Sequence, residues 1–121
     1  MKRKTIRNHR DFITSRDCLM ARSSLFILKT KPAKIVNDAR YGLVASKRSF
    51  KLATQRNRAK RLIRDWISYN EDLMSSNLDY IFILNTDILN SDRENGRNEV
   101  KQALKKILKL LQNTTDNNER K

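Results

Sequence analysis

The sequence of 121 residues contains one cysteine, Cys18, and one histidine, His9. One thiol cannot form an internal disulfide, and one thiol with one imidazole cannot supply the ligands of a structural zinc ion. No stretch approaches the roughly 20 apolar residues that a membrane-spanning helix needs. Residues 1–10 are basic and polar, unlike a secretion signal. We therefore expect a cytoplasmic protein whose fold is held together by packing.

Acidic side chains are scarce in the first half of the chain. Residues 1–64 carry 19 basic and 3 acidic side chains, a formal charge of +16. Residues 65–121 carry 8 basic and 10 acidic side chains, a formal charge of −2. Such a concentration of positive charge on one half of a chain is typical of a protein that binds a polyanion.

The length of the chain and its hydrophobic content of 38% fit one compact domain and are too small for two. We expect this single domain to occupy residues 1–111. Residues 86–96 are polar and are interpreted as a connection inside the domain. Residues 112–121 are also polar and are predicted to form a disordered tail, because they offer almost no apolar surface to bury.

Hydrophobic periodicity predicts an α/β fold. Three short apolar runs have the length of strands, over residues 25–28, 41–45 and 79–84. The first two are expected to be neighbours in a sheet, and their continuous apolar character suggests burial on both faces. Helices are predicted over residues 8–20, from residue 54 onward, and over residues 100–111. Asn8 is a residue type that caps the first of these helices.

The predicted helix after Thr54 separates into two faces when it is projected at 100° per residue. One face is apolar and is expected to enter the core, with Ala59, Leu62, Ile63, Trp66 and Ile67. The other face carries Asn57, Lys60, Arg61 and Arg64. Like charges one helical turn apart repel by a few tenths of a kcal/mol per pair, and no acid interrupts this face before Asp65. The pattern favours a phosphate-binding surface over an ordinary solvated face, which usually mixes both signs.

Three kinds of polyanion could meet this helix. A membrane surface is disfavoured because the apolar face, with Trp66, is needed to cover the neighbouring strands. Double-stranded DNA is disfavoured because no helix-turn-helix spacing, zipper or zinc site is visible. RNA remains by elimination. In addition, the amide of Asn57 can both donate and accept hydrogen bonds, which suits a ribose or a base edge.

The segment from Arg56 to Arg64 resembles the RNR signature, RNxxKRxxR, of the bacterial ribonuclease P protein subunit. Its surroundings resemble the same family. The preceding segment 41–48 matches a strand that ends in Ser-Lys-Lys, Asp11-Phe12 matches the Asp-Phe of the first family helix, and segments 25–28 and 78–83 match two further strands. The resemblance extends over roughly residues 8–111.

The resemblance implies a two-layer α/β sandwich like domain 2 of ribosomal protein S5, in which the RNR helix makes a left-handed crossover between parallel strands. It also implies the function of the family. The protein subunit binds the catalytic RNA and the 5′ leader of precursor tRNA, and the RNA removes the leader with Mg²⁺. On this reading the chain has no catalytic residue and no metal ligand of its own, and Mg²⁺ is bound mainly through RNA.

The resemblance assigns the candidate site residue by residue. Contacts with the catalytic RNA are implied for Lys47, Arg48, Arg56, Asn57, Arg58, Lys60, Arg61 and Arg64. A cleft for the leader is implied at Phe12 and Phe26, which match aromatic positions of the family. Two further cleft positions have Arg16 and Lys29 where the family often has aromatic residues, so this cleft is expected to depend more on charge. The connection 49–55 is one residue longer than the family pattern and lacks its glycine, so its turn must be built differently.

Two other functions stay open at this level. A structural RNA-binding protein, such as a ribosomal component, could use the same basic helix without affecting cleavage. A nuclease that works without RNA is disfavoured, because the sequence shows neither a carboxylate cluster for two-metal catalysis nor a pair of histidines. Phe12 and Phe26 also have an alternative role as core residues, which is the usual fate of isolated aromatic side chains.

Overall fold

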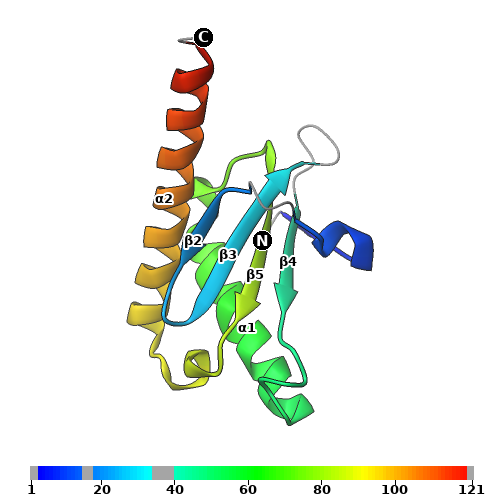
Figure 1. Ribbon diagram of the computed structural model, residues 1–121. Coiled ribbons are helices and arrows are strands. Elements are labelled where there is room, and N and C mark those ends of the chain that lie inside the picture. Colours follow the sequence, from blue (N-terminus) through cyan, green and yellow to red (C-terminus); the bar gives the residue numbers. More distant parts are fainter. Residues whose placement is uncertain (1–2, 15–17, 34–39, 120–121) are drawn as a thin grey trace.

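The computed structural model describes residues 3–14, 18–33 and 40–119. Its centre is a five-stranded mixed sheet (Figure 1). The strands are β1 (Lys4–Thr5), β2 (Met20–Arg22), β3 (Phe26–Pro32), β4 (Arg40–Val44) and β5 (Leu78–Leu84). The spatial order is β1-β4-β5-β3-β2, in which β4 runs parallel to β5 and β3 runs antiparallel to it. The three strands that the sequence predicts are all present.

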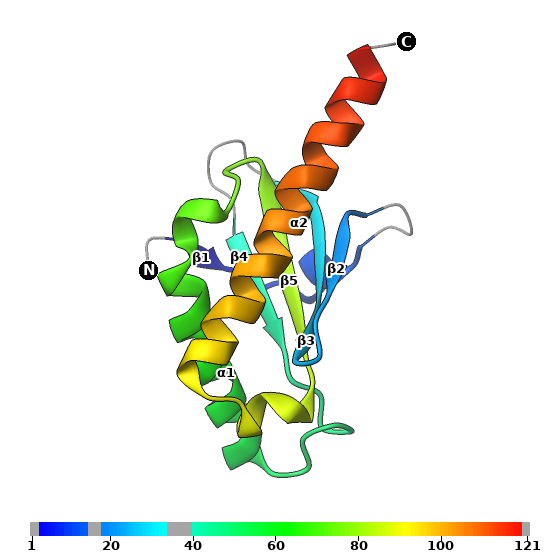
Figure 2. The same ribbon diagram turned by 90° about the vertical axis from the view of Figure 1, so that its left-hand side faces the viewer.

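Two long helices, α1 (Ala53–Tyr69) and α2 (Arg93–Glu119), cover one face of the sheet (Figures 1 and 2). Three short 3-10 helices complete the described structure, namely η1 (His9–Phe12), η2 (Glu71–Leu73) and η3 (Thr86–Asn90). The fold is therefore the two-layer α/β sandwich that the family resemblance implies. None of the described helices has the length and apolar character that crossing a membrane requires.

The central position of β5 corrects one prediction. Segments 25–28 and 41–45 were expected to pair with each other, but β5 lies between β3 and β4. Every position of β5 is buried except the half-buried Ile83. This strand is the most continuously apolar of the chain, and a central strand flanked on both edges is where such a run is best accommodated.

The connection from β4 through α1 to β5 joins two adjacent parallel strands. In Figure 1 both strands point downward and β5 lies to the left of β4. Figure 2, turned by 90°, has α1 to the left of the sheet, so the helix lies behind the sheet in the view of Figure 1. This arrangement makes the crossover left-handed, as the family resemblance implies. Right-handed crossovers are the strong general rule, and the sequence pattern alone gives no sign of the exception.

Alternating side chains of the strands point to two different environments. On β3, Phe26, Leu28 and Thr30 are buried beneath the helices, whereas Ile27, Lys29 and Lys31 are half-buried on the other side. We call this second side the open face. The covered side forms one core with α1 and α2, whose largest fully buried side chains include Trp66 and Phe82.

The N-terminal helix is much shorter than predicted. The cap is correct, because the side chain of Asn8 accepts a hydrogen bond from the backbone N–H of Arg10 at 3.1 Å. However, the helix is a single 3-10 turn that ends at Phe12, and Met20 begins β2. Phe12 packs against Gly42 of the sheet and Met20 belongs to β2, so tertiary contacts override a weak helical pattern.

The C-terminal segment differs from the prediction in the opposite direction. Residues 112–119 were expected to be disordered, but they continue α2 to Glu119. A helix that is already nucleated by packing gains one hydrogen bond for each residue that it adds, so a polar extension can remain helical. The predicted connection 86–96 also contains structure, because it includes η3 with the fully buried Ile88 and the first turn of α2.

Candidate RNA-binding surface

The helix α1 has the two faces that its periodicity predicts. Ala59, Ile63, Trp66 and Ile67 are at most 1% exposed. On the other side, Asn57, Arg58, Arg61 and Arg64 are exposed, and Arg56 and Lys60 are half-buried. We call these six residues the RNR surface. Leu62, the fifth residue of the predicted apolar face, is half-buried and packs against the same core, so the charged face is left for solvent or for a partner.

The basic surface continues into the turn before α1, where Lys47 and Arg48 are exposed. The turn begins at Ser46, whose carbonyl oxygen accepts from the Phe50 N–H at 2.9 Å and whose hydroxyl accepts from the Ser49 N–H at 3.2 Å. The side chain of Phe50 is fully buried. The atypical connection is thus built by a serine-stabilised turn and an aromatic anchor in place of glycine.

Arg56 links this turn to the helix. Its guanidinium Nη1 donates a hydrogen bond to the backbone oxygen of Phe50 at 2.7 Å. The side chain therefore holds the turn that carries Lys47 and Arg48, in addition to the RNA contact that the resemblance implies for it. The sequence pattern did not reveal this second role, because Phe50 lies six residues before Arg56.

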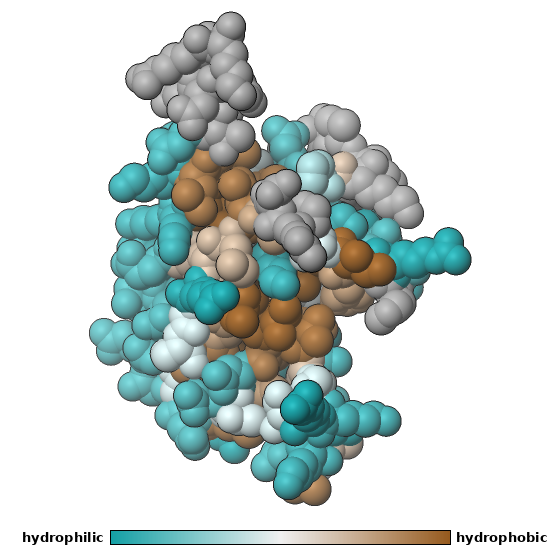
Figure 3. All heavy atoms as spheres, in the orientation of Figure 1, coloured by the Kyte–Doolittle hydropathy of each residue, from teal (hydrophilic) through white to brown (hydrophobic). Residues whose placement is uncertain are grey.

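The open face is the second part of the candidate site. Figure 3 shows apolar atoms running down this face between hydrophilic margins. Phe12 and Lys29 both lie here and are half-buried. The ring of Phe12 rests on Gly42, because a Cβ added to that glycine would approach Cε1 of Phe12 to 2.5 Å. The structure therefore brings Phe12 and Lys29 to the same face of the sheet.

Phe26 does not belong to this face. Its side chain is 1% exposed and packs edge-on against Phe82, with ring centroids 5.3 Å apart, in the core beneath the helices. The structure therefore does not bring Phe26 to the open face with Phe12, because the alternation of β3 directs its side chain to the covered face. Arg16, the fourth residue assigned to the cleft, lies outside the described residues.

An ion network holds η1 over the open face. Arg40 of β4 donates to Oδ2 of Asp11 at 3.0 Å and to Oδ2 of Asp79 at 3.1 Å. Burial of the guanidinium lowers its pKa, but hydrogen bonds to Asp11 and Asp79 and their negative charges outweigh this effect and raise the pKa of Arg40. From β3, Nζ of Lys31 donates to the backbone oxygens of Asp11 and Ile13, at 3.2 and 3.3 Å.

This network fixes the position of Phe12, the residue after Asp11. Asp79 is fully buried on β5, and its Oδ1 also accepts from the backbone N–H of Arg40 at 2.8 Å. Sequence reasoning missed the roles of Arg40, Lys31 and Asp79. The only available signal was a charged residue at the start of an apolar run, as at Asp79, which usually requires a partner when it is buried.

A pocket of ≈ 370 Å³ lies where β3 begins and β5 ends. Ile27 and Ile83 line it from the open face, and Ser49 lines it from the basic turn. The apolar open face and the turn with Lys47 and Arg48 are therefore adjacent, so one extended ligand could contact both.

A family model described as Ribonuclease P matches residues 1–108. The chain belongs to the ribonuclease P protein family. A 48-residue segment is 50% identical to the ribonuclease P protein component of Pseudomonas putida strain KT2440, and this match covers 40% of the chain. The match spans 35% of the length of that curated relative, about a third.

Solved structures of bacterial ribonuclease P proteins share the fold. The protein from Staphylococcus aureus superposes with a TM-score of 0.70 at 23% identity, covering 86% of this chain and 94% of the other. The protein from Thermotoga maritima gives a TM-score of 0.66 at 21% identity, covering 81% and 92%. These similarities establish the two-layer α/β architecture of the family for this chain.

The described part of the chain has no cluster of potential metal ligands. Within residues 3–14, 18–33 and 40–119, no group of three or more His, Cys, Asp or Glu side chains is placed to hold a metal ion. The buried carboxylates Asp11 and Asp79 are engaged by Arg40. Both of these carboxylates therefore already have a cationic partner.

Proposed function

We propose that this chain is the protein subunit of a ribonuclease P ribonucleoprotein that removes the 5′ leader of precursor tRNA in the cytoplasm. The RNR surface, with Lys47 and Arg48, binds the catalytic RNA. The open face, with Phe12 and Lys29, binds the leader. The catalytic groups belong to the RNA, and Mg²⁺ is bound mainly through RNA.

The observation that carries this proposal is the adjacency of two surfaces of different character. The cations of the RNR surface lie on a helix whose apolar side chains pack into the core. The interaction that this surface offers to a partner is therefore phosphate binding. The open face has an apolar strip with a half-buried aromatic ring and a lysine, which suits the bases and phosphates of a single strand. A protein that binds the catalytic RNA and the leader of precursor tRNA at the same time needs both surfaces.

Reconstituted cleavage tests the proposal. Precursor tRNA is incubated with the purified protein alone, with ribonuclease P RNA alone, and with both at low Mg²⁺ concentration. We expect 5′ maturation to be fastest with both and absent with the protein alone. Cleavage by the protein alone would refute the assignment of catalysis to RNA. Binding of the RNA without any gain in cleavage would instead favour a structural RNA-binding protein, the second candidate.

The leader assignment has its own test. We expect Phe12→Ala to weaken holoenzyme binding of leader-bearing precursor by about tenfold, because loss of one base–aromatic stack costs about 1–3 kcal/mol. Binding of mature tRNA should stay the same. Ile13→Ala is the matched control, since Ile13 follows Phe12 and is 65% exposed. Equal losses for both ligands would show that the ring does not contact the leader.

A further inference from the structure

Basic side chains also form a stripe along α2. Arg93, Arg97, Lys101, Lys105 and Lys109 follow one another at intervals of four residues. Arg97 is half-buried and the other four are exposed. At a rise of 1.5 Å per residue the stripe is about 24 Å long. We call these five residues the α2 stripe.

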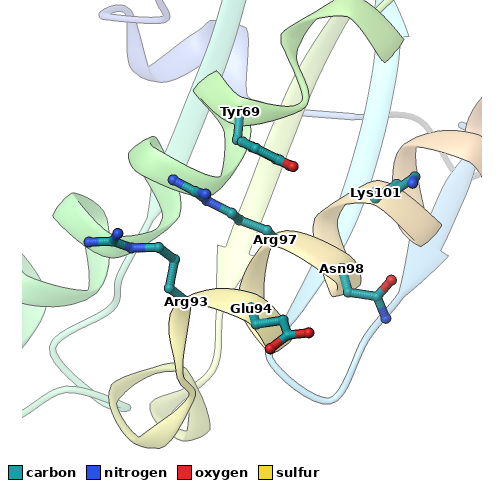
Figure 4. Close-up of a pocket in the computed structure, with 6 residues that line it drawn as sticks. All are labelled: Tyr69, Arg93, Glu94, Arg97, Asn98 and Lys101. Carbon is teal, nitrogen blue, oxygen red and sulfur yellow. The ribbon is translucent and has the colours of Figure 1, made fainter.

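Few acids neutralise this stripe. Residues 93–113 include two, Glu94 and Glu99, and residues 100–113 contain four lysines and no acid. Glu99 is turned toward β2, where it accepts a hydrogen bond from the Ser23 hydroxyl at 2.8 Å. Glu94 points away from α1, whereas Arg93 and Arg97 extend toward it (Figure 4). The formal charge of −2 on residues 65–121 therefore conceals a local cationic surface.

An exposed aromatic ring lies beside the start of the stripe. Tyr69, at the end of α1, is 63% exposed, and the guanidinium of Arg97 stacks over it at 4.2 Å from the ring centroid. Both residues line a pocket of ≈ 380 Å³ together with Arg93 and Lys101 (Figure 4). Arg97 covers one side of the ring, and the high exposure leaves the other side free for a flat ligand.

The ion pair that Arg97 makes is weak. Its Nη2 lies 3.4 Å from Oδ2 of Asp65, a carboxylate whose side chain is 50% exposed. Exposed pairs of this kind contribute little. The Nε of Arg97 is buried and makes no hydrogen bond to the described residues. The guanidinium thus has donor capacity that its present contacts do not use.

The stripe is suited to a polyanion but not to a membrane. The apolar face of α2 is turned to the core, where Val100, Leu104 and Ile107 are completely buried, and Leu108 and Leu111 are half-buried. A helix that lies on a bilayer must insert that face. Cations with an adjacent exposed aromatic ring are instead the combination that binds single-stranded nucleic acid, in which phosphates meet the charges and bases stack.

We propose that Tyr69 and the α2 stripe bind an unpaired segment of the catalytic RNA, as a second contact beyond the RNR surface. This inference rests on the proposed function. Tyr69 lies on the same side of α1 as Arg58 and Arg61, within an arc of about 80°. The stripe lies on the helical layer, opposite to the open face, so it extends the surface for the catalytic RNA and is separated from the leader.

Binding to full-length ribonuclease P RNA tests this contact, with dissociation constants measured over a range of salt concentrations. Lys101→Gln should lower the salt slope by about 0.7 to 0.9, the value of one phosphate contact. The matched control Lys106→Gln removes an equally exposed charge from the same helix, off the stripe, and should keep the wild-type slope. Tyr69→Ala should weaken binding about tenfold, and Tyr69→Phe should restore it.

Two results would overturn the contact. One is that the affinity for RNA has the same salt slope in Lys101→Gln and in Lys106→Gln. The other is unchanged affinity in Tyr69→Ala together with competition by polyglutamate equal to that by a 12-nucleotide oligouridylate, which would indicate an acidic protein partner. Arg61→Ala distinguishes the two proposals. If it weakens RNA binding while the α2 variants do not, the second contact fails and the proposed function stands.

Discussion

The two faces of the sheet use the same residue types for opposite purposes. Beneath the helices, Phe26 is 1% exposed and its ring packs against Phe82. On the open face, Phe12 is half-buried and rests on Gly42, and among the described helices only its own short turn η1 lies on this face. On the covered face, Phe26 contributes to stability. On the open face, the ring of Phe12 is accessible to a ligand.

The two glycines of the chain repeat this difference. A Cβ at Gly96 would lie 2.2 Å from Cε2 of Trp66, a ring that is 1% exposed. A Cβ at Gly42 would lie 2.5 Å from Cε1 of Phe12. Each glycine makes room for an aromatic ring, but only the ring on the open face has somewhere to move. The comparison suggests that substitutions on the covered face change stability and that those on the open face change binding.

The largest effect is expected for Phe26→Ala. Truncating a fully buried phenylalanine removes its apolar contacts and leaves a cavity, which costs about 3–5 kcal/mol. The free energy of unfolding in urea measures this loss. Phe12→Ala is the counterpart on the open face and should cost less than half as much. Similar losses for the two variants would break the distinction between the faces.

A loss of about 3 kcal/mol is expected for Arg40→Met, because it leaves the fully buried carboxylate of Asp79 without its cation. Urea unfolding measures this change as well. The double variant Arg40→Met with Asp79→Leu should recover part of the stability, since replacing both partners of a buried pair by apolar residues is often neutral. A double variant as unstable as the single one would show that shape, and not charge, matters here.

Gly96→Ala should destabilise the protein by about 2 kcal/mol, because overpacking a core typically costs 1–3 kcal/mol and Trp66 cannot yield. Gly42→Ala should cost less in thermal unfolding, since Phe12 can swing outward. Its main effect should be weaker binding of leader-bearing substrate. The reverse order of stabilities would contradict the proposed freedom of Phe12.

The smallest effect on stability is expected for Arg61→Ala, within about 0.5 kcal/mol, because the side chain is exposed. Binding to ribonuclease P RNA should nevertheless weaken, and its salt slope should fall by about one phosphate contact. Gln102→Ala, an exposed change on α2, is a control for stability and binding. An unchanged slope in Arg61→Ala would remove this residue from the RNA interface.

Local patterns predicted much of the fold and part of the site. Helical periodicity placed Trp66 in the core and Arg61 on the surface of α1, and continuous apolar character marked β5 as a buried strand. The RNR signature and its surroundings indicated the family that the family model confirms. These features depend on residues close together in the chain, whose spacing fixes the side of a helix or strand on which they lie.

Features that join distant segments could not be predicted in this way. The spatial order of the strands, the left-handed crossover and the network of Arg40 with Asp11 and Asp79 all depend on the approach of residues far apart in the sequence. The face on which Phe26 lies could not be predicted either. Every position of segment 25–28 is apolar, so only the register of β3 with β5 shows to which face each side chain points.

The sequence by itself determined that the chain has a strongly basic first half, an amphipathic RNR helix and an α/β composition, because charge and periodicity are local properties. Tertiary structure decided which aromatic ring lies on the open face and which one supports the core. It also placed Tyr69 beside Arg97, 28 positions later in the chain, at a ring distance of 4.2 Å. Burial and proximity arise only when the two layers pack, and for that reason the folded chain was needed to find them.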